Sequence, residues 1–127
     1  MTTYIQNQLE TMLDDLIKEI RNLDRQRSTA LLNGKIDNFN FQLLGNNINS
    51  MSNQVSNLNT QIVLRNLNKV TIDEPRPGAM LETAIDQLND ASRHLDDVHK
   101  ALLASAQVIN VVTDITYEVM KLGLIPI

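Results

Sequence analysis

Apolar residues recur at alternating spacings of three and four through the first half of the chain. This heptad pattern places them on one side of an α-helix, and an apolar stripe of this kind needs a partner helix to cover it. The pattern predicts a helix from about residue 4 to residue 68. The stripe positions that we expect to form a packed seam are Leu9, Leu16, Leu23, Leu44, Ile48, Val55, Leu58 and Ile62.

Two prolines and a glycine interrupt the pattern within residues 71–78, which we therefore read as a linker. Proline lacks an amide N–H and clashes with the preceding turn, so a helix does not continue through such a segment. The heptad then resumes and predicts a second helix from about 79 to 122, with Gly123 as its C-terminal stop. Its seam positions are Leu88, Leu95, Leu102, Ile109 and Val112.

The segment around Gly34 leaves two alternatives for the first helix. Asn33 and Gly34 could end one helix, with Asp37 capping the next. However, the heptad keeps its phase across this segment, and one glycine inside a helix costs only about 1 kcal/mol. We therefore predict a continuous helix, kinked or weakened near Gly34. Arg27 and Asp37 fall at seam positions, where a polar group commonly fixes helix register or oligomeric state.

These elements predict an all-α protein with a single domain, residues 1–127, built as a long antiparallel helical hairpin. The composition agrees, because 43% of the residues are hydrophobic but only 3% are aromatic, as in bundles whose cores are aliphatic. A hairpin of two helices leaves each seam half covered. We therefore expect a homodimer or larger oligomer that forms a coiled-coil-like helical bundle.

Two segments have an unusual composition for helices. Residues 38–64 contain no charged side chain, although exposed helix faces usually carry Glu, Lys and Arg, and Asn and Ser are poor helix formers. This segment is expected to touch something other than solvent, either a neighbouring helix or a lipid surface, pore lumen or separate partner. Residues 101–119 are apolar on more than one side, which predicts burial inside a bundle or, alternatively, a membrane-competent segment.

Candidate chemistry is sparse. The chain has no cysteine, no glycine-rich phosphate loop and no nucleophile motif, so we predict that it is not an enzyme. One acidic run has metal-ligand residue types, but a single predicted helix carries all of it and such runs are usually solvated, so we expect no metal or cofactor. The residues of this acidic run are Asp86, Asp90, His94, Asp96, Asp97 and His99.

The net charge of −4 argues against a nucleic-acid partner, which would need a basic face. No signal peptide and no transmembrane helix are apparent, so a cytoplasmic location is the default and export without a signal peptide stays open. We predict a non-enzymatic helical scaffold or protein–protein interaction protein that self-associates, has no small-molecule substrate and binds another protein. The alternative is a membrane-acting protein, pore-forming or lipid-binding, that uses segments 38–64 and 101–119.

Overall fold

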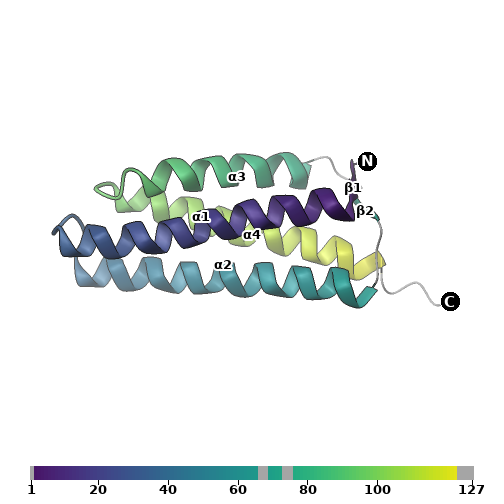
Figure 1. Ribbon diagram of the computed structural model, residues 1–127, viewed down its shortest axis with the longest axis horizontal. Helices are drawn as coiled ribbons and strands as arrows, with labels where there is room; N and C mark the ends of the chain where they lie inside the picture. The colour runs from purple at the N-terminus through teal and green to yellow at the C-terminus, as the bar shows by residue number, and fades with distance from the viewer. Residues whose placement is uncertain (1, 66–68, 73–75, 123–127) are drawn as a thin grey trace.

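The computed structural model describes the backbone of residues 2–65, 69–72 and 76–122, and the side chains of residues 11–62 and 81–121. These residues form four helices: α1 (Gln6–Leu32), α2 (Asn38–Arg65), α3 (Arg76–Ser92) and α4 (Val98–Leu122). The helices lie side by side as a bundle (Figure 1). The predicted all-α class is confirmed.

The bundle consists of two antiparallel hairpins, α1–α2 and α3–α4, whose turns lie at the same end of the molecule (Figure 1). Each helix packs against two others: α1 against α2 and α3, and α4 against the same two. As a result, α2 runs parallel to its neighbour α4, and α1 runs parallel to α3. This arrangement turns the apolar side of every helix towards one shared core.

The core contains most of the predicted seam. Those seam residues that are fully buried are Leu16, Leu23, Leu44, Ile48, Val55, Leu58, Ile62, Leu88, Leu95 and Val112. Leu102 and Ile109 are only half-buried at the edge of the core, and the side chain of Leu9 lies outside the described residues. Because helices of the same chain cover the seam, its burial does not require a second copy.

The first heptad forms two helices, so the prediction of one continuous helix through Gly34 is wrong. Helix α1 ends in a Schellman motif, in which the Lys35 N–H donates to the Ala30 carbonyl at 2.8 Å and the Gly34 N–H donates to the Leu31 carbonyl at 3.1 Å. Gly34 has a φ of 72°, which glycine adopts without the steric cost of a Cβ. The Asn-Gly pair therefore ends the helix despite the continuous heptad phase.

The start of α2 is equally well specified. The Asp37 carboxylate accepts a hydrogen bond from the Asn40 N–H at 2.8 Å, as an N-cap residue does. Ile36 directly precedes this cap and Phe41 follows it by four residues, which are the positions of a hydrophobic staple. Ile36 is buried, and Phe41 packs against the core. The alternative that read Gly34 and Asp37 as stop and start signals is therefore correct.

The second heptad is also divided, and the prediction of one helix over 79–122 is wrong. A turn separates α3 from α4, yet Leu95 within it is buried and keeps the heptad phase, so the apolar pattern does not reveal the break. Small polar residues mark the break between the two helices instead. The Ser92 hydroxyl donates to the Asn89 carbonyl at 2.8 Å and competes with helix continuation, and Asp97 occupies the position before α4, where aspartate is favoured.

A short antiparallel pair of strands closes the end of the bundle opposite the turns (Figure 1). Strand β1 (Thr2–Ile5) pairs with β2 (Lys69–Ile72), with Thr2 opposite Ile72. The heptad pattern does not predict these strands, although their β-branched residues favour extended backbone. The first helix therefore begins at residue 6 rather than 4.

The predicted linker over residues 71–78 is only partly a linker. Ile72 belongs to β2, residues 73–75 lie outside the described part of the chain, and α3 already begins at Arg76. Pro77 sits in the first turn of α3, where a missing N–H breaks no helical hydrogen bond. Proline here marks the start of a helix.

Two adjacent residues of α2, one buried and one exposed, should respond differently to the same added charge. Leu58→Asp should lower the free energy of unfolding by about 3 kcal/mol or more, because it buries an unpaired carboxylate among aliphatic side chains. Asn57→Asp adds the same charge at an exposed position and should change stability by no more than about 0.5 kcal/mol. Urea denaturation followed by circular dichroism measures both, and equal effects would contradict the assignment of these two faces.

Candidate interaction surface

Arg27 and Asp37 do not form the shared polar layer that the seam pattern predicts. Asp37 is exposed at the start of α2, where it acts as the cap. Arg27 reaches from α1 across to α2: its guanidinium carbon lies 3.9 Å from the centroid of the Phe41 ring, and Nη1 donates to the Phe41 carbonyl at 3.0 Å. The other terminal nitrogen of the guanidinium, Nη2, forms an ion pair with Oδ1 of Asp24 at 2.7 Å. Arg27 therefore fastens α1 to α2 near their turn.

Gly45 is also part of this contact, which the heptad pattern does not predict. A Cβ on Gly45 would collide with Nη1 of Arg27, so the glycine leaves the space that the guanidinium fills. Glycine inside a helix is unfavourable by about 1 kcal/mol relative to alanine, and close approach by another group is a common reason for it. The signal available in the sequence was the glycine itself, in the interior of a predicted helix.

Besides the shared apolar core, part-buried polar contacts link the two hairpins. The Asn47 amide on α2 donates to the Ser105 hydroxyl at 3.0 Å and to the Leu102 carbonyl at 3.4 Å, both on α4. Between α1 and α3, the Asn89 amide donates to the Glu19 carboxylate at 2.9 Å. These contacts fix the register between parallel neighbours, so Asn47 lies beside the stretch of α4 that begins at Leu102.

The outer side of α2 carries a stripe of exposed residues at helical spacings of three and four. Its members all belong to the charge-free segment 38–64, and they are Phe39, Leu43, Asn46, Ser50, Asn53 and Asn57. Phe39 is 69% exposed, although it is a large aromatic residue. The segment that was expected to be covered therefore has a solvent-facing side without a charge.

A second stripe with the same spacing runs along α4. Its members are half-buried or exposed, and they are Leu102, Ala106, Ile109, Thr113, Tyr117 and Met120. The contact of Asn47 with Leu102 and Ser105 identifies this as the side of α4 towards α2. The α2 and α4 stripes together form what we call the α2–α4 face, which contains no Asp, Glu, Lys or Arg.

The charged residues in the C-terminal half of α4 lie on a different side of that helix from the α2–α4 face. Asp114, Glu118 and Lys121 share a helical stripe with Gln107, which faces the groove towards α3, and Lys121 pairs with Glu118 at 3.3 Å. The predicted membrane-competent segment 101–119 is thus neither buried all round nor exposed all round. Residues such as Val108 and Val112 are in the core, while Leu103 is 68% exposed.

The outer sides of α1 and α3 differ from the α2–α4 face in being charged. Lys18, Arg21 and Arg25 form a basic stripe on α1 at spacings of three and four, and Asp24 adjoins it. Residues 82, 86 and 90, which are Glu, Asp and Asp, form an acidic stripe on α3. Ordinary solvated helix surfaces carry charges of this kind, so the lack of charge on the α2–α4 face is specific to that side of the molecule.

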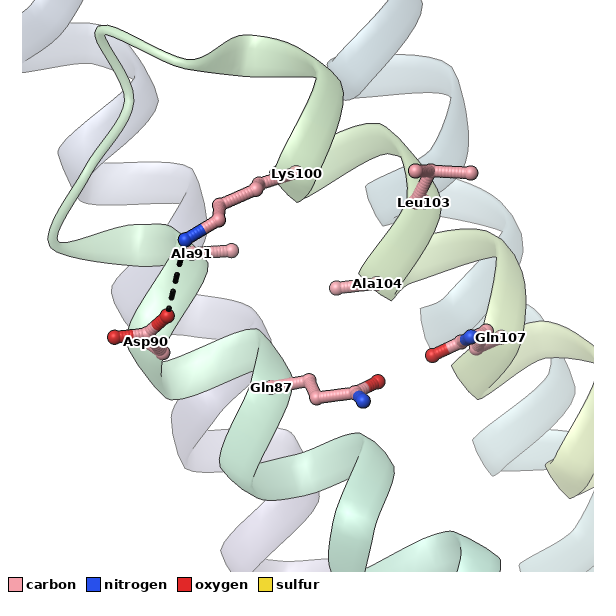
Figure 2. Close-up of a pocket in the computed structure, with 7 residues that line it drawn as sticks. All are labelled: Gln87, Asp90, Ala91, Lys100, Leu103, Ala104 and Gln107. Carbon is pink, nitrogen blue, oxygen red and sulfur yellow. Dashed lines mark ion pairs between the residues drawn. The ribbon is translucent and has the colours of Figure 1, made fainter.

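A groove of about 250 Å³ separates α3 from α4 on a neighbouring side of the bundle (Figure 2). Ala91 and Ala104 face each other across it, and a 3.7 Å ion pair between Lys100 and Asp90 closes one end. Asp90 also lies 3.6 Å from Nδ1 of His94. Within the residues whose positions are described, no three or more Asp, Glu, His or Cys side chains come together as metal ligands. The acidic run that was considered for metal binding is spread over α3, the following turn and the first turn of α4, where His99 lies.

Comparison with known proteins gives no relative: no family model, curated protein or solved structure matches the chain. Over the described parts of the chain, none of the helices combines the length and the apolar content needed to cross a bilayer. The surface itself is therefore the best guide to what the protein does.

The Arg27–Gly45 contact predicts that the effects of two substitutions depend on each other. With Arg27→Ala present, Gly45→Ala should stabilise the protein by about 0.5–1 kcal/mol, because alanine favours helix and nothing occupies the space. With Arg27 intact, the gain should shrink by at least about 0.5 kcal/mol, because the new methyl group displaces the guanidinium. A double-mutant cycle in urea measures this coupling, and additive effects would contradict the proposed contact.

Proposed function

We propose that this chain is a non-enzymatic helical scaffold that acts by binding protein through the α2–α4 face. One observation carries the proposal: two charge-free segments that are far apart in the sequence, 38–64 and 101–113, lie side by side with an exposed surface. Either segment alone has a plain explanation as part of a core. Together they make one continuous surface without charge, spread over two helices.

The composition of this surface is that of an interface. The centres of protein interfaces are depleted in Lys, Glu and Asp and enriched in aromatic residues and Met. The α2–α4 face has no acidic or basic residue and exposes Phe39, Tyr117 and Met120. Asn and Ser at its centre lower the helix propensity of α2, so their presence needs a reason other than helix formation. Contact with a partner supplies that reason.

The same composition favours a protein partner over a lipid bilayer. Asn46, Asn53 and Asn57 present amides that would lose their hydrogen bonds in hydrocarbon, at a cost of a few kcal/mol for each group. Another protein can return those hydrogen bonds. In addition, insertion of 101–119 into a membrane would remove Val108, Val112 and their neighbours from the core of the bundle. We therefore propose segments 38–64 and 101–119 as parts of a protein-binding fold rather than as membrane elements.

Site-specific photo-crosslinking in the cells that produce the protein tests this function. A photoreactive amino acid replaces Asn53 at the centre of the α2–α4 face and, in a matched control, Gln87 on α3; both positions are exposed amides. We expect protein adducts from position 53 and not from position 87, with the attached peptide identified by mass spectrometry.

Each other outcome counts against the proposal. Adducts from position 87 alone would point to the groove between α3 and α4, which Gln87 lines. Adducts with lipid at position 53 would support the membrane-acting alternative. Equal labelling at both positions, or none at position 53, would mean that the α2–α4 face has no specific protein partner.

A further inference from the structure

We infer that the partner of the α2–α4 face is the same face of a second copy of this chain, in a two-fold symmetric contact. The inference rests on the proposed function, because a second copy is one of the protein partners that this function allows. Three properties of the described surface favour it: the hydrogen-bonding chemistry of the face, the charge of the other faces, and its area.

The polar groups of the face are complementary to themselves. Each Asn side chain carries both a donor and an acceptor, so Asn46, Asn53 and Asn57 of one copy can pair with amides of another. A two-fold contact brings one patch against an identical patch, which demands this kind of self-complementarity. A face built from carboxylates or ammonium groups alone would repel its copy.

Charge disfavours two-fold contacts through α1 alone or through α3 alone. Two copies that met through α1 alone would bring three basic residues, Lys18, Arg21 and Arg25, against their own equivalents, with Asp24 as the adjoining acidic residue. Two copies that met through α3 would bring Asp86 and Asp90 against their own equivalents. Like charges opposed across an interface suppress association. The α2–α4 face avoids direct opposition of like charges.

The area of the face is sufficient for a stable dimer. Helices α2 and α4 overlap along a length of roughly 35 Å, and two neighbouring helices are roughly 20 Å wide, so the face covers about 700 Å². A stable interface of standard size buries about 600–1,000 Å² on each partner, and the face falls within this range. Phe39, Leu43, Tyr117 and Met120 provide exposed apolar area near the two ends of the face, and the amides lie between them.

Sedimentation equilibrium of the purified full chain tests the inference. We expect the native chain to be a dimer at micromolar concentrations. Asn53→Glu should raise the Kd by at least about tenfold, because the symmetric contact gains two like charges. Gln87→Glu, which adds the same charge at an exposed site on α3, should leave the Kd unchanged. Both variants should keep the helical content of the native chain by circular dichroism, since neither position is buried.

Opposite charges separate electrostatic repulsion from misfolding. Asn53→Lys alone should also weaken the dimer, whereas an equimolar mixture of the Asn53→Glu and Asn53→Lys chains should form a heterodimer. Recovery in the mixture requires that position 53 of one copy lies near the face of the other. Failure of the mixture to associate, with both variants folded, would overturn the inference.

A monomeric native chain at 100 µM, or a dimer that Asn53→Glu does not weaken, would also overturn the inference. The proposed function would then be decided separately by the crosslinks from position 53. An adduct with a different protein would retain the function and replace the second copy as the partner, whereas no protein adduct would remove both.

Discussion

Mutual burial of four apolar stripes within one chain is the interaction on which the rest of the structure depends. Each helix has one apolar side, and the two turns fold the chain so that all four sides face a single aliphatic core. The turns are therefore as important as the stripes. Gly34 and Asp37 end and restart the first heptad, so that the apolar stripes of α1 and α2 can meet within one chain. Capping chemistry at a few positions thus converts a pattern typical of coiled-coil assembly into a self-contained bundle.

The apolar core is covered within one chain, and this affects how the exposed residues are interpreted. Because the seam is satisfied internally, the features left at the surface are not remnants of helix packing and need their own explanation. The outer sides of α1 and α3 carry the charges of a solvated protein, whereas the α2–α4 face carries amides, hydroxyls and a few apolar side chains. Register contacts such as that between Asn47 and Ser105 align the two charge-free segments along their length. The interaction surface is therefore a product of the tertiary arrangement and exists in neither helix alone.

The helical class and most of the core could be predicted from heptad spacing, because burial follows the 3.6-residue period closely: Leu16, Leu44 and Leu88 are all fully buried. The number of helices could not be predicted, because Leu95 keeps the apolar phase through a turn and phase does not report backbone breaks. Two parts of the α2–α4 face were visible as unusual composition in 38–64 and 101–119. Their adjacency was not, since it depends on which helices become neighbours. The role of Gly45 was hidden for the same reason, as its partner Arg27 comes from another helix.

The central claim is that one chain covers its own apolar stripes by folding back at Gly34, and a single intramolecular distance tests it most directly. The chain has no cysteine, so Arg21→Cys with Asn49→Cys provides unique sites for nitroxide labels on exposed positions of α1 and α2. Electron–electron double resonance on labelled chains diluted with unlabelled protein reports only distances within one molecule. The hairpin predicts a distance of about 20 Å, since packed helix axes lie about 10 Å apart and the labels add length. A distance of about 40 Å, which a continuous helix between the two positions would give, would contradict the fold and everything argued from it.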